Sequence, residues 1–310
     1  MKKRWYAYLI LVALLLCAGV LAPLLINLTK PARDLTEIRK NPERIVSLAP
    51  NLTEILFALG LGEKIVAVSS DSDYPPEAAG IKKIGTFWQP NTEAIIAAKP
   101  DLVITLWFQQ QKAVADTLNR LGYQVLTVKI ETVEELSKAI QKVGIATGRK
   151  QHADELVKSI NSQLNDLQSK LSSTDSVKAL WVVQAEPLRV AGRNTFINEL
   201  LELANGENAI GPTISQYPQI GTEQLLICGA EVIIQAAMTT HNIPEQQQAA
   251  NVFWSRYPQL PAVKNNRIHV IESDTIIRLG PRLPQGIELI AGCLHPNTFA
   301  KRRDAEQQSR

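Results

Sequence analysis

Four aromatic side chains beside prolines are the residues of this sequence best suited to hold a ligand. They lie in loops that follow predicted strands, and they are Tyr74, Phe87, Trp88 and Tyr217. Loops at the carboxyl ends of strands form the ligand-binding edge of open α/β sheets, and aromatic faces suit an apolar ring system. The alternative for each residue alone is a side chain that fills its own lobe's core. Several aromatic loops together favour a shared pocket.

Charged side chains near the C-terminus could add polar contacts to the same pocket. The predicted loop 274–282 carries Asp274, Arg278 and Arg282. Because Asp274 and Arg278 are four residues apart, the alternative is a local ion pair at the surface, which contributes little to stability.

No pattern in the chain indicates catalysis. The sequence contains no Gly-x-Ser-x-Gly, no phosphate-binding loop and no dinucleotide glycine fingerprint. Its four histidines, at positions 152, 241, 269 and 295, fall in separate predicted elements without metal-ligand spacing. We therefore expect no enzyme, no metal site and no cofactor.

A fourteen-residue segment occurs twice, with its copies 130 residues apart, at 91–104 and 221–234. Both copies contain a Thr-Glu pair, a short apolar helix, an acidic residue and a predicted buried strand. This separation is that of a domain rather than of a solenoid repeat. The repeat therefore predicts two similar lobes, and a cleft between two lobes commonly holds a ligand.

Predicted strands alternate with helices of ordinary length in both halves, which is typical of doubly wound parallel sheets. In the first half, Thr53 is expected to cap a helix over residues 54–59. The stretch 238–248 in the second half predicts a polar loop or irregular helix. The predicted fold class is therefore α/β, with two doubly wound lobes of similar topology.

The segment 150–172 contains no glycine or proline and separates the two halves. Its apolar residues step by four and three along one face, at Leu156, Ile160, Leu164, Leu167 and Leu171. This pattern predicts one amphipathic helix of about 22 residues, or roughly 33 Å. Such a helix would join the lobes as a rigid strut.

The basic residues are concentrated at the chain ends. Of 33 basic and 30 acidic side chains, three basic ones lie in residues 1–4, and four basic and two acidic ones lie in residues 301–310. The remainder holds 26 basic and 28 acidic residues, and it contains no basic stripe with interleaved aromatics. Nucleic acid is therefore not expected as a partner.

The N-terminus predicts attachment to a membrane. Residues 5–29 are uncharged and follow three basic residues. The stretch is longer than the apolar core of a signal peptide and long enough to cross a bilayer. The basic residues would keep this end cytoplasmic and place the remainder outside. We expect a retained anchor; a cleaved signal and a lipidated Cys17 are the alternatives.

The two remaining cysteines, Cys228 and Cys293, are expected to be separate buried thiols. A disulfide between them is the alternative that an exported location allows. Together these observations divide the chain into six segments: a membrane anchor or signal segment (1–30), a linker (31–43), an N-terminal lobe (44–148), a connecting helix (149–173), a C-terminal lobe (174–296) and a disordered tail (297–310).

Several motifs resemble the substrate-binding proteins of ABC importers for iron siderophores and vitamin B12. They are the segment 44–60, Ser72-Asp-Tyr-Pro-Pro76, Lys99-Pro-Asp-Leu-Val103 and Gly280-Pro-Arg-Leu283. The resemblance covers residues 44–296 and is strongest to the vitamin B12-binding branch. It implies a monomeric periplasmic or extracytoplasmic protein, here tethered by residues 5–29. Such a protein captures a small molecule without catalysis and delivers it to a permease dimer with its ATPase subunits.

In that branch, aromatic residues wall the corrin ring, and an Asp and an Arg of the C-terminal lobe help to hold it. The resemblance implies a corrinoid, vitamin B12 or a precursor, as the ligand. Two aromatic positions of the branch fall near Asp71 and Arg189 here, and Trp88 and Tyr74 are neighbours that could substitute. A ferric siderophore or haem is the alternative ligand, and a membrane-anchored ligand sensor is the alternative role. The expected ligand-binding residues are Tyr74, Phe87, Trp88, Arg189, Tyr217, Asp274 and Arg278.

Glu93 and Glu223 are the matched acidic residues of the repeat, one in each lobe. Each alone suits the first turn of a helix, where a carboxylate interacts favourably with the helix dipole. The resemblance implies a further role, because in the family a glutamate at this point of each lobe docks into an arginine pocket on one permease subunit. We expect the pair to dock the protein onto a two-fold permease.

Overall fold

The computed structural model describes residues 41–237 and 242–299. The described residues belong to one compact unit. The predicted anchor with Cys17, His241, nearly all of the linker and most of the tail lie outside the described residues. Within the described part of the chain, no helix is long and apolar enough to cross a membrane.

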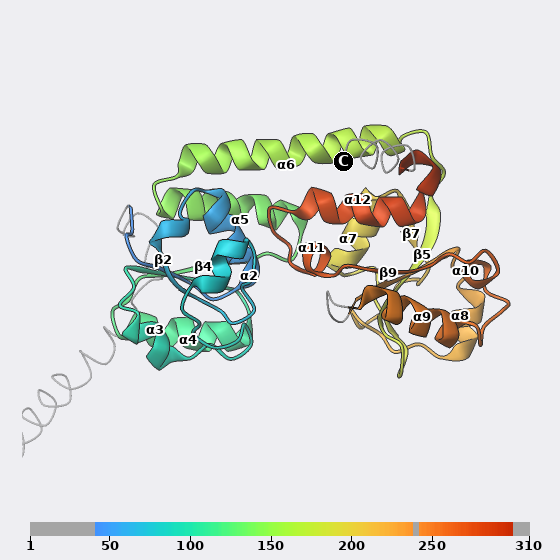
Figure 1. Ribbon diagram of the computed structural model, residues 1–310, viewed down its shortest axis with the longest axis horizontal. Coiled ribbons are helices and arrows are strands. Elements are labelled where there is room, and N and C mark those ends of the chain that lie inside the picture. Colours follow the sequence, from blue (N-terminus) through green and yellow to red (C-terminus); the bar gives the residue numbers. More distant parts are fainter. Residues whose placement is uncertain (1–40, 238–241, 300–310) are drawn as a thin grey trace, which may run out of the picture. The chain divides into compact units, whose positions relative to one another are not determined.

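The first sheet has four parallel strands in the order β2-β1-β3-β4 (Figure 1). Its strands are short, largely apolar and mostly buried, as expected where helices cover both faces of a parallel sheet. The strands are β1 (Ile45–Ser47), β2 (Ile65–Val68), β3 (Leu102–Leu106) and β4 (Val125–Val128). The helices of this half are α2 (Pro50–Ala58), α3 (Thr92–Ala97), α4 (Gln109–Arg120) and α5 (Val133–Ala146).

The second sheet repeats this order. Strand β5 pairs in parallel with β7 on one edge and with β8 on the other, and β9 lies beyond β8, while the short β6 pairs antiparallel with the end of β5. The strands are β5 (Val177–Gln184), β6 (Arg189–Val190), β7 (Gly206–Asn208), β8 (Val232–Ala236) and β9 (Ile268–Ile271). The helices are α7 (Phe196–Leu203), α8 (Thr222–Ile227), α9 (Ile243–Trp254), α10 (Pro261–Lys264), α11 (Asp274–Ile277) and α12 (Leu283–Leu294).

The sequence repeat corresponds to a structural repeat. Helix α3 and strand β3 begin and end 130 positions before α8 and β8, and each strand is the third parallel strand of its sheet along the chain. Each sheet also has its own cluster of buried apolar residues. The predicted α/β fold class with parallel sheets is confirmed. The segment boundaries stay a prediction, because both sheets lie in one compact unit.

Helix α6 covers Lys150–Leu171, which confirms the predicted long helix of 22 residues. It packs against α5, from the first half, and against α12, from the second (Figure 1). Four of the five predicted apolar positions are buried, while Leu156 is only half-buried and its neighbour Val157 is buried instead. His152 is exposed on this helix, as the polar face predicts.

Three local predictions were wrong or incomplete. Thr53 does not cap α2, because that helix begins at Pro50 and Thr53 lies buried within its first turns. Proline at the first helical position needs no amide partner there, so the helix can start earlier than the cap pattern suggested. The expected loop over 274–282 contains α11, and the stretch after Asn242 is the regular helix α9. Cys228 and Cys293 are not joined to each other by a disulfide, as expected; Cys293 is buried, whereas Cys228 is half-buried rather than buried.

Candidate ligand-binding site

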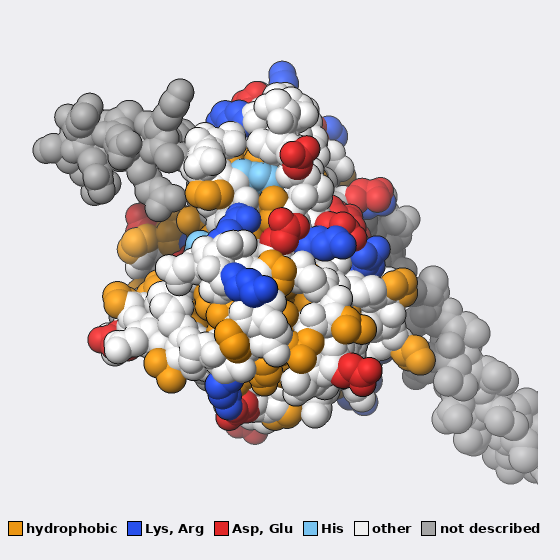
Figure 2. Space-filling model, turned by 90° about the vertical axis from the view of Figure 1, so that its right-hand side faces the viewer, with side chains coloured by type: hydrophobic (Ala, Val, Ile, Leu, Met, Phe, Trp, Pro, Cys, Tyr) orange, Lys and Arg blue, Asp and Glu red, His pale blue; other side chains and the backbone are white. Residues whose placement is uncertain are grey.

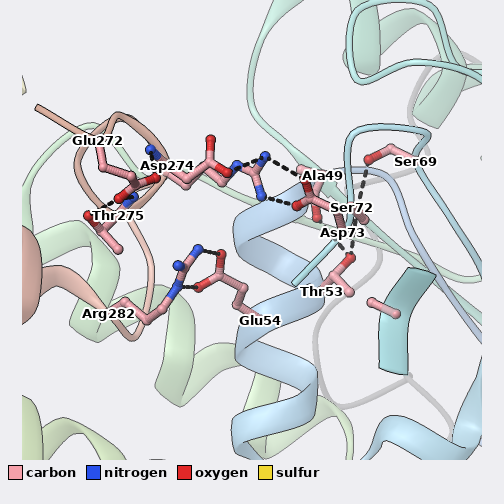
Figure 3. Close-up of polar contacts among 12 residues, drawn as sticks. Ala49, Thr53, Glu54, Ser69, Ser72, Asp73, Glu272, Asp274, Thr275 and Arg282 are labelled. Carbon is pink, nitrogen blue, oxygen red and sulfur yellow. Dashed lines mark hydrogen bonds and ion pairs between the residues drawn. The ribbon is translucent and has the colours of Figure 1, made fainter. Parts of the chain in front are cut away.

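Buried hydroxyl groups fix the loop that carries Asp73 and Tyr74. Thr53 Oγ1 lies 2.8 Å from Ser47 Oγ and 3.0 Å from Ser72 Oγ, and Ser69 Oγ lies 2.8 Å from Ser72 Oγ (Figure 3). All four side chains are fully buried. The hydroxyls satisfy one another, so the loop after β2 is held against the end of β1 by polar contacts that water does not reach.

Three aromatic residues of the first half form one cluster. The rings of Phe87, Trp88 and Phe108 lie with their centroids 4.8–5.4 Å apart, within the range of favourable ring pairs. Trp88 is 60% exposed and Trp107, from the loop after β3, is 57% exposed. Two large aromatic side chains therefore face solvent at the carboxyl end of the first sheet.

Gln111 and Asp71 hold this aromatic loop in place. The Gln111 amide is fully buried and makes four hydrogen bonds: it donates to the carbonyls of Leu48 and Phe87 and accepts from Thr105 Oγ1 and the Leu106 amide. The Asp71 carboxylate accepts the Phe87 amide at 2.6 Å. Asp71 is thus a loop-positioning residue.

Two ion pairs join the loop 274–282 to the first half of the chain. Arg282 donates to both carboxylate oxygens of Glu54, at 2.9 and 2.6 Å (Figure 3). Arg278 pairs with both oxygens of Asp73 and also lies 3.3 Å from the Asp274 carboxylate. The Asn51 amide adds a hydrogen bond of 3.1 Å to the Leu279 carbonyl. The local pair between Asp274 and Arg278 therefore exists, but Arg278 also reaches a residue about 200 positions away.

The carboxylates of this cluster differ in pKa. Burial raises the pKa of Glu54 and outweighs the opposing effect of Arg282. The hydrogen bond from Arg278 lowers the pKa of Asp73, whose side chain is largely exposed. Burial also raises the pKa of Asp274. Tyr74 completes the group, because the Arg282 guanidinium carbon lies 3.8 Å from the centroid of its ring.

The remaining predicted ligand residues, Arg189 and Tyr217, lie in the second half. Arg189 begins β6 with its side chain exposed, and its backbone bridges to Gln219 in the loop of Tyr217. Tyr217 is half-buried, and burial raises its pKa. In the described part of the chain, no hydrogen bond, ion pair or ring contact joins Arg189 or Tyr217 to the aromatic cluster or to the loop 274–282. The structure brings five of the seven residues into two contacting groups and leaves these two apart.

A surface hollow of about 860 Å³ lies elsewhere, over α9. No predicted ligand residue lines it; its lining residues include Val252, Phe253, Arg256 and Glu186. On the face shown in Figure 2, hydrophobic side chains are interspersed with charged and polar ones rather than gathered in one patch. Among the described residues, no group of acidic, histidine or cysteine side chains could hold a metal ion.

Glu93 and Glu223 occupy equivalent positions, each the second residue of its helix, and both are exposed. Within the described residues, neither carboxylate has a hydrogen-bond or ion-pair partner. The other acidic residue of the repeat has a structural role. Asp101 accepts the amides of Glu43 and Arg44, and Glu231 accepts the amide of Lys178, so each holds the start of the neighbouring strand.

Sequence reasoning missed Trp107 and Phe108, which lie between a predicted strand and a predicted helix. An aromatic pair directly after a buried strand was the available signal. It also missed Asp73, Glu54 and Gln111, whose partners lie far away in the sequence. No local pattern marks such partners.

Comparisons with known proteins agree with this geometry. Residues 45–275 match the family model described as periplasmic binding protein. The chain is 35% identical over 275 residues to the uncharacterized ABC transporter substrate-binding lipoprotein YvrC of Bacillus subtilis, covering 86% of this chain and 84% of that protein.

Two solved structures show the same fold. The periplasmic vitamin B12 binding protein BtuF of Vibrio cholerae is 27% identical, with a TM-score of 0.72 over 83% of this chain and 98% of that one. The periplasmic heme-binding protein RhuT from Roseiflexus has the same TM-score at 24% identity, over 83% and 99% of the two chains, and shows the fold alone. The chain therefore belongs to the periplasmic binding protein family, as a substrate-binding component of an ABC transporter and not an enzyme.

Proposed function

We propose that this protein captures a corrinoid, vitamin B12 or a precursor, outside the cytoplasmic membrane and delivers it to an ABC permease. The observation that carries the ligand class is the aromatic cluster of Phe87, Trp88 and Phe108, in which Trp88 is exposed. The exposed Trp107 directly precedes Phe108, and the exposed Tyr74 lies in the same half. Such rings can stack on a large, flat and largely apolar macrocycle. The likeness to vitamin B12-binding BtuF supports the same ligand class.

The ligand would lie between the aromatic cluster and residues of the second half. Asp274 and Arg278 carry hydrogen-bonding groups that can orient amide side chains of a corrin ring, and Arg189 and Tyr217 would contact its far side. The bound ring would cover Trp88 and remove a large apolar surface from water, which stabilises a complex by about 25 cal/mol per Å² of apolar area.

Calorimetric titration of the full chain in detergent tests this proposal. The probes are cobalamin, cobinamide, haem and a ferric siderophore. We expect binding of at least one corrinoid that is tighter than binding of haem or siderophore. Tight haem or siderophore binding with no heat from either corrinoid would contradict the corrinoid assignment and favour the alternative ligand of the same family.

We also propose that Glu93 and Glu223 dock the protein onto a permease dimer with its ATPase subunits. Both carboxylates are exposed and lie at equivalent places in the repeated unit, so they suit two equal basic sites on a two-fold partner. Binding of ligand by a chain that no permease accepts as a partner would instead support a membrane-anchored sensor.

The location of the protein follows from its family, and its tether is part of the proposal. Residues 5–29 would anchor the chain in the cytoplasmic membrane. Intact-mass analysis of membrane-extracted protein should find the N-terminus at Met1 or Lys2. A chain that starts between residues 18 and 32 would contradict a retained anchor, and a lipid mass on Cys17 would identify a lipoprotein.

A further inference from the structure

Both arginines of the loop 274–282 are already neutralised by carboxylates of the protein. Arg282 is bidentate to Glu54, a side chain that is only 4% exposed. Arg278 is shared between Asp274, from its own helix, and Asp73, which reaches it from the other half of the chain. Neither Arg278 nor Arg282 therefore offers an unpaired guanidinium group to a ligand that approaches this loop.

The group as a whole carries an excess of negative charge. Glu272 adds a fourth carboxylate, since it accepts the Asp274 amide at 2.6 Å and caps α11. Four carboxylates thus face two guanidinium groups, a net charge of −2. The nearby Lys83 donates to the carbonyls of Ser72 and Ala78, and its charge interacts with Asp73 first and with Asp71 second. Counting Lys83 and Asp71 as well gives five carboxylates and three cations, so the net charge stays at −2.

We propose that Asp73 is a specificity-determining residue, which makes the site select neutral or cationic ligands over ligands that carry carboxylates. This inference rests on the proposed function, because it takes the loop 274–282 to contact the ligand. A carboxylate on the ligand would have to displace Asp73 from Arg278 or lie unpaired beside it, and a like charge at a contact opposes binding. An amide group can instead accept a hydrogen bond from Arg278 while the ion pair stays in place.

Among the three expected ligand classes, this selection favours the corrinoid. Corrinoid side chains are mostly neutral amides, whereas haem carries two propionates and many ferric siderophores carry carboxylates. The Asp73 carboxylate is the member of the cluster that can be changed with least damage, because its side chain is 59% exposed while that of Glu54 is buried.

Matched ligand pairs test the inference independently of the ring system. One pair is cyanocobalamin and its monocarboxylic acid, in which one amide is replaced by a carboxylate. The other is haem and its dimethyl ester. For the full chain in detergent, we expect the member of each pair without the free carboxylate to be preferred by at least about tenfold, or about 1.4 kcal/mol, in each pair that binds. Preference for the ester of haem with no corrinoid binding would contradict the corrinoid assignment but support the selection rule.

Asp73→Asn should reduce this preference to about twofold, chiefly by tighter binding of the carboxylate member. Glu77→Gln is the matched control, because it removes the same charge from an exposed residue of the same loop region. The control should keep the wild-type ratio. An unchanged ratio in Asp73→Asn, or equal changes in both variants, would overturn the inference.

Inorganic phosphate provides a probe that needs no ring system. Calorimetry should detect phosphate binding to Asp73→Asn, in which Arg278 has lost one carboxylate, and at least tenfold weaker binding to the wild type and to Glu77→Gln. Equal phosphate affinity in all three proteins would show that Asp73 does not mask Arg278, and the inference would then be wrong.

Discussion

The two halves of this protein share a framework and differ at its edge. In each half, a six-residue helix (α3 or α8) precedes the repeated strand (β3 or β8). The turn between helix and strand contains a residue with a left-handed backbone, Lys99 with φ 48° or Gly229 with φ 66°. Asp101, just before β3, accepts the amide of Arg44, just before β1. In the same way Glu231, just before β8, accepts the amide of Lys178 in β5. These features hold strands together, so both copies retain them.

The loops at the strand ends have diverged. The first half has buried hydroxyls, the Gln111 amide and exposed aromatic rings. The second half has a charged loop whose arginines reach across to Glu54 and Asp73. A parallel sheet constrains the residues within its strands and leaves the loops beyond their carboxyl ends free to vary, and ligands bind there. The comparison therefore separates residues that build the fold from residues that adapt the site.

The largest expected effect comes from an exposed feature that both halves keep, the paired glutamates. The double variant Glu93→Ala with Glu223→Ala should abolish uptake in a reconstituted transporter while leaving ligand affinity and thermal stability nearly unchanged. Docking onto two equal sites needs both carboxylates, whereas folding needs neither. Glu63→Ala with Glu245→Ala is the control, since both residues are exposed and lie in the first turns of other helices. Uptake at the wild-type rate by the double variant would show that Glu93 and Glu223 only favour the starts of their helices and do not dock the protein.

Gln111 and Gln247 each lie on a helix and bond to backbone groups of a neighbouring strand, but their substitution should affect stability to different extents. Gln111 of α4 is fully buried with four hydrogen bonds, whereas Gln247 of α9 is half-buried and bonds to Ile268, Val270 and Asn251. Gln111→Leu would leave buried partners unpaired and should lower the free energy of unfolding by about 2–4 kcal/mol, and Gln247→Leu by about 1 kcal/mol. Urea denaturation followed by tryptophan fluorescence measures both. Equal losses would mean that the aromatic loop does not depend on the Gln111 amide.

Trp88 should matter for binding and not for folding. Trp88→Ala removes an exposed ring that we place against the ligand, so it should weaken corrinoid binding by about 1–3 kcal/mol. Leu121→Ala is the matched control, because Leu121 is 58% exposed in the same half but lies at the end of α4. Calorimetry should show a loss of affinity for the first variant alone. Equal affinity in both variants would show that Trp88 does not contact the ligand.

The smallest expected effect concerns the two ion pairs that join the halves, which should respond to pH with opposite signs. The pKa of Asp73 is lowered from 3.8, so its contribution to stability is present above that pH and is lost as the pH falls. The pKa of Glu54 is raised from 4.5, so its contribution is present below that pH and is lost as the pH rises. Solvent screens the Asp73 pair, so Asp73→Asn should cost less than about 1 kcal/mol at pH 7.

Urea denaturation at pH 7, 5 and 3 measures this difference between wild type and Asp73→Asn. The two proteins should converge toward pH 3. A difference that stays constant across this range would mean that the Asp73 charge does not contribute to the effect.

Much of the framework was predictable because its signals are local. The repeat at 91–104 and 221–234 predicted the shared helix–strand unit, and the apolar spacing over 150–172 predicted α6. The start of α2 and the helix α9 were not predicted correctly, because tertiary contacts there outweigh capping and composition. Thr53 suits a cap, yet its hydroxyl is used by Ser47 and Ser72 in the folded protein.

The fold class, the long helix and the matched glutamates follow from the sequence alone, because hydrophobic period and repetition can be read along the chain. Which charges meet depends on the tertiary structure. Asp73 and Arg278, like Glu54 and Arg282, are more than 200 residues apart, and no periodicity links them. Their pairing depends on how two separately built sheets bring their loops together. The charge available to a ligand is therefore a property of the folded protein.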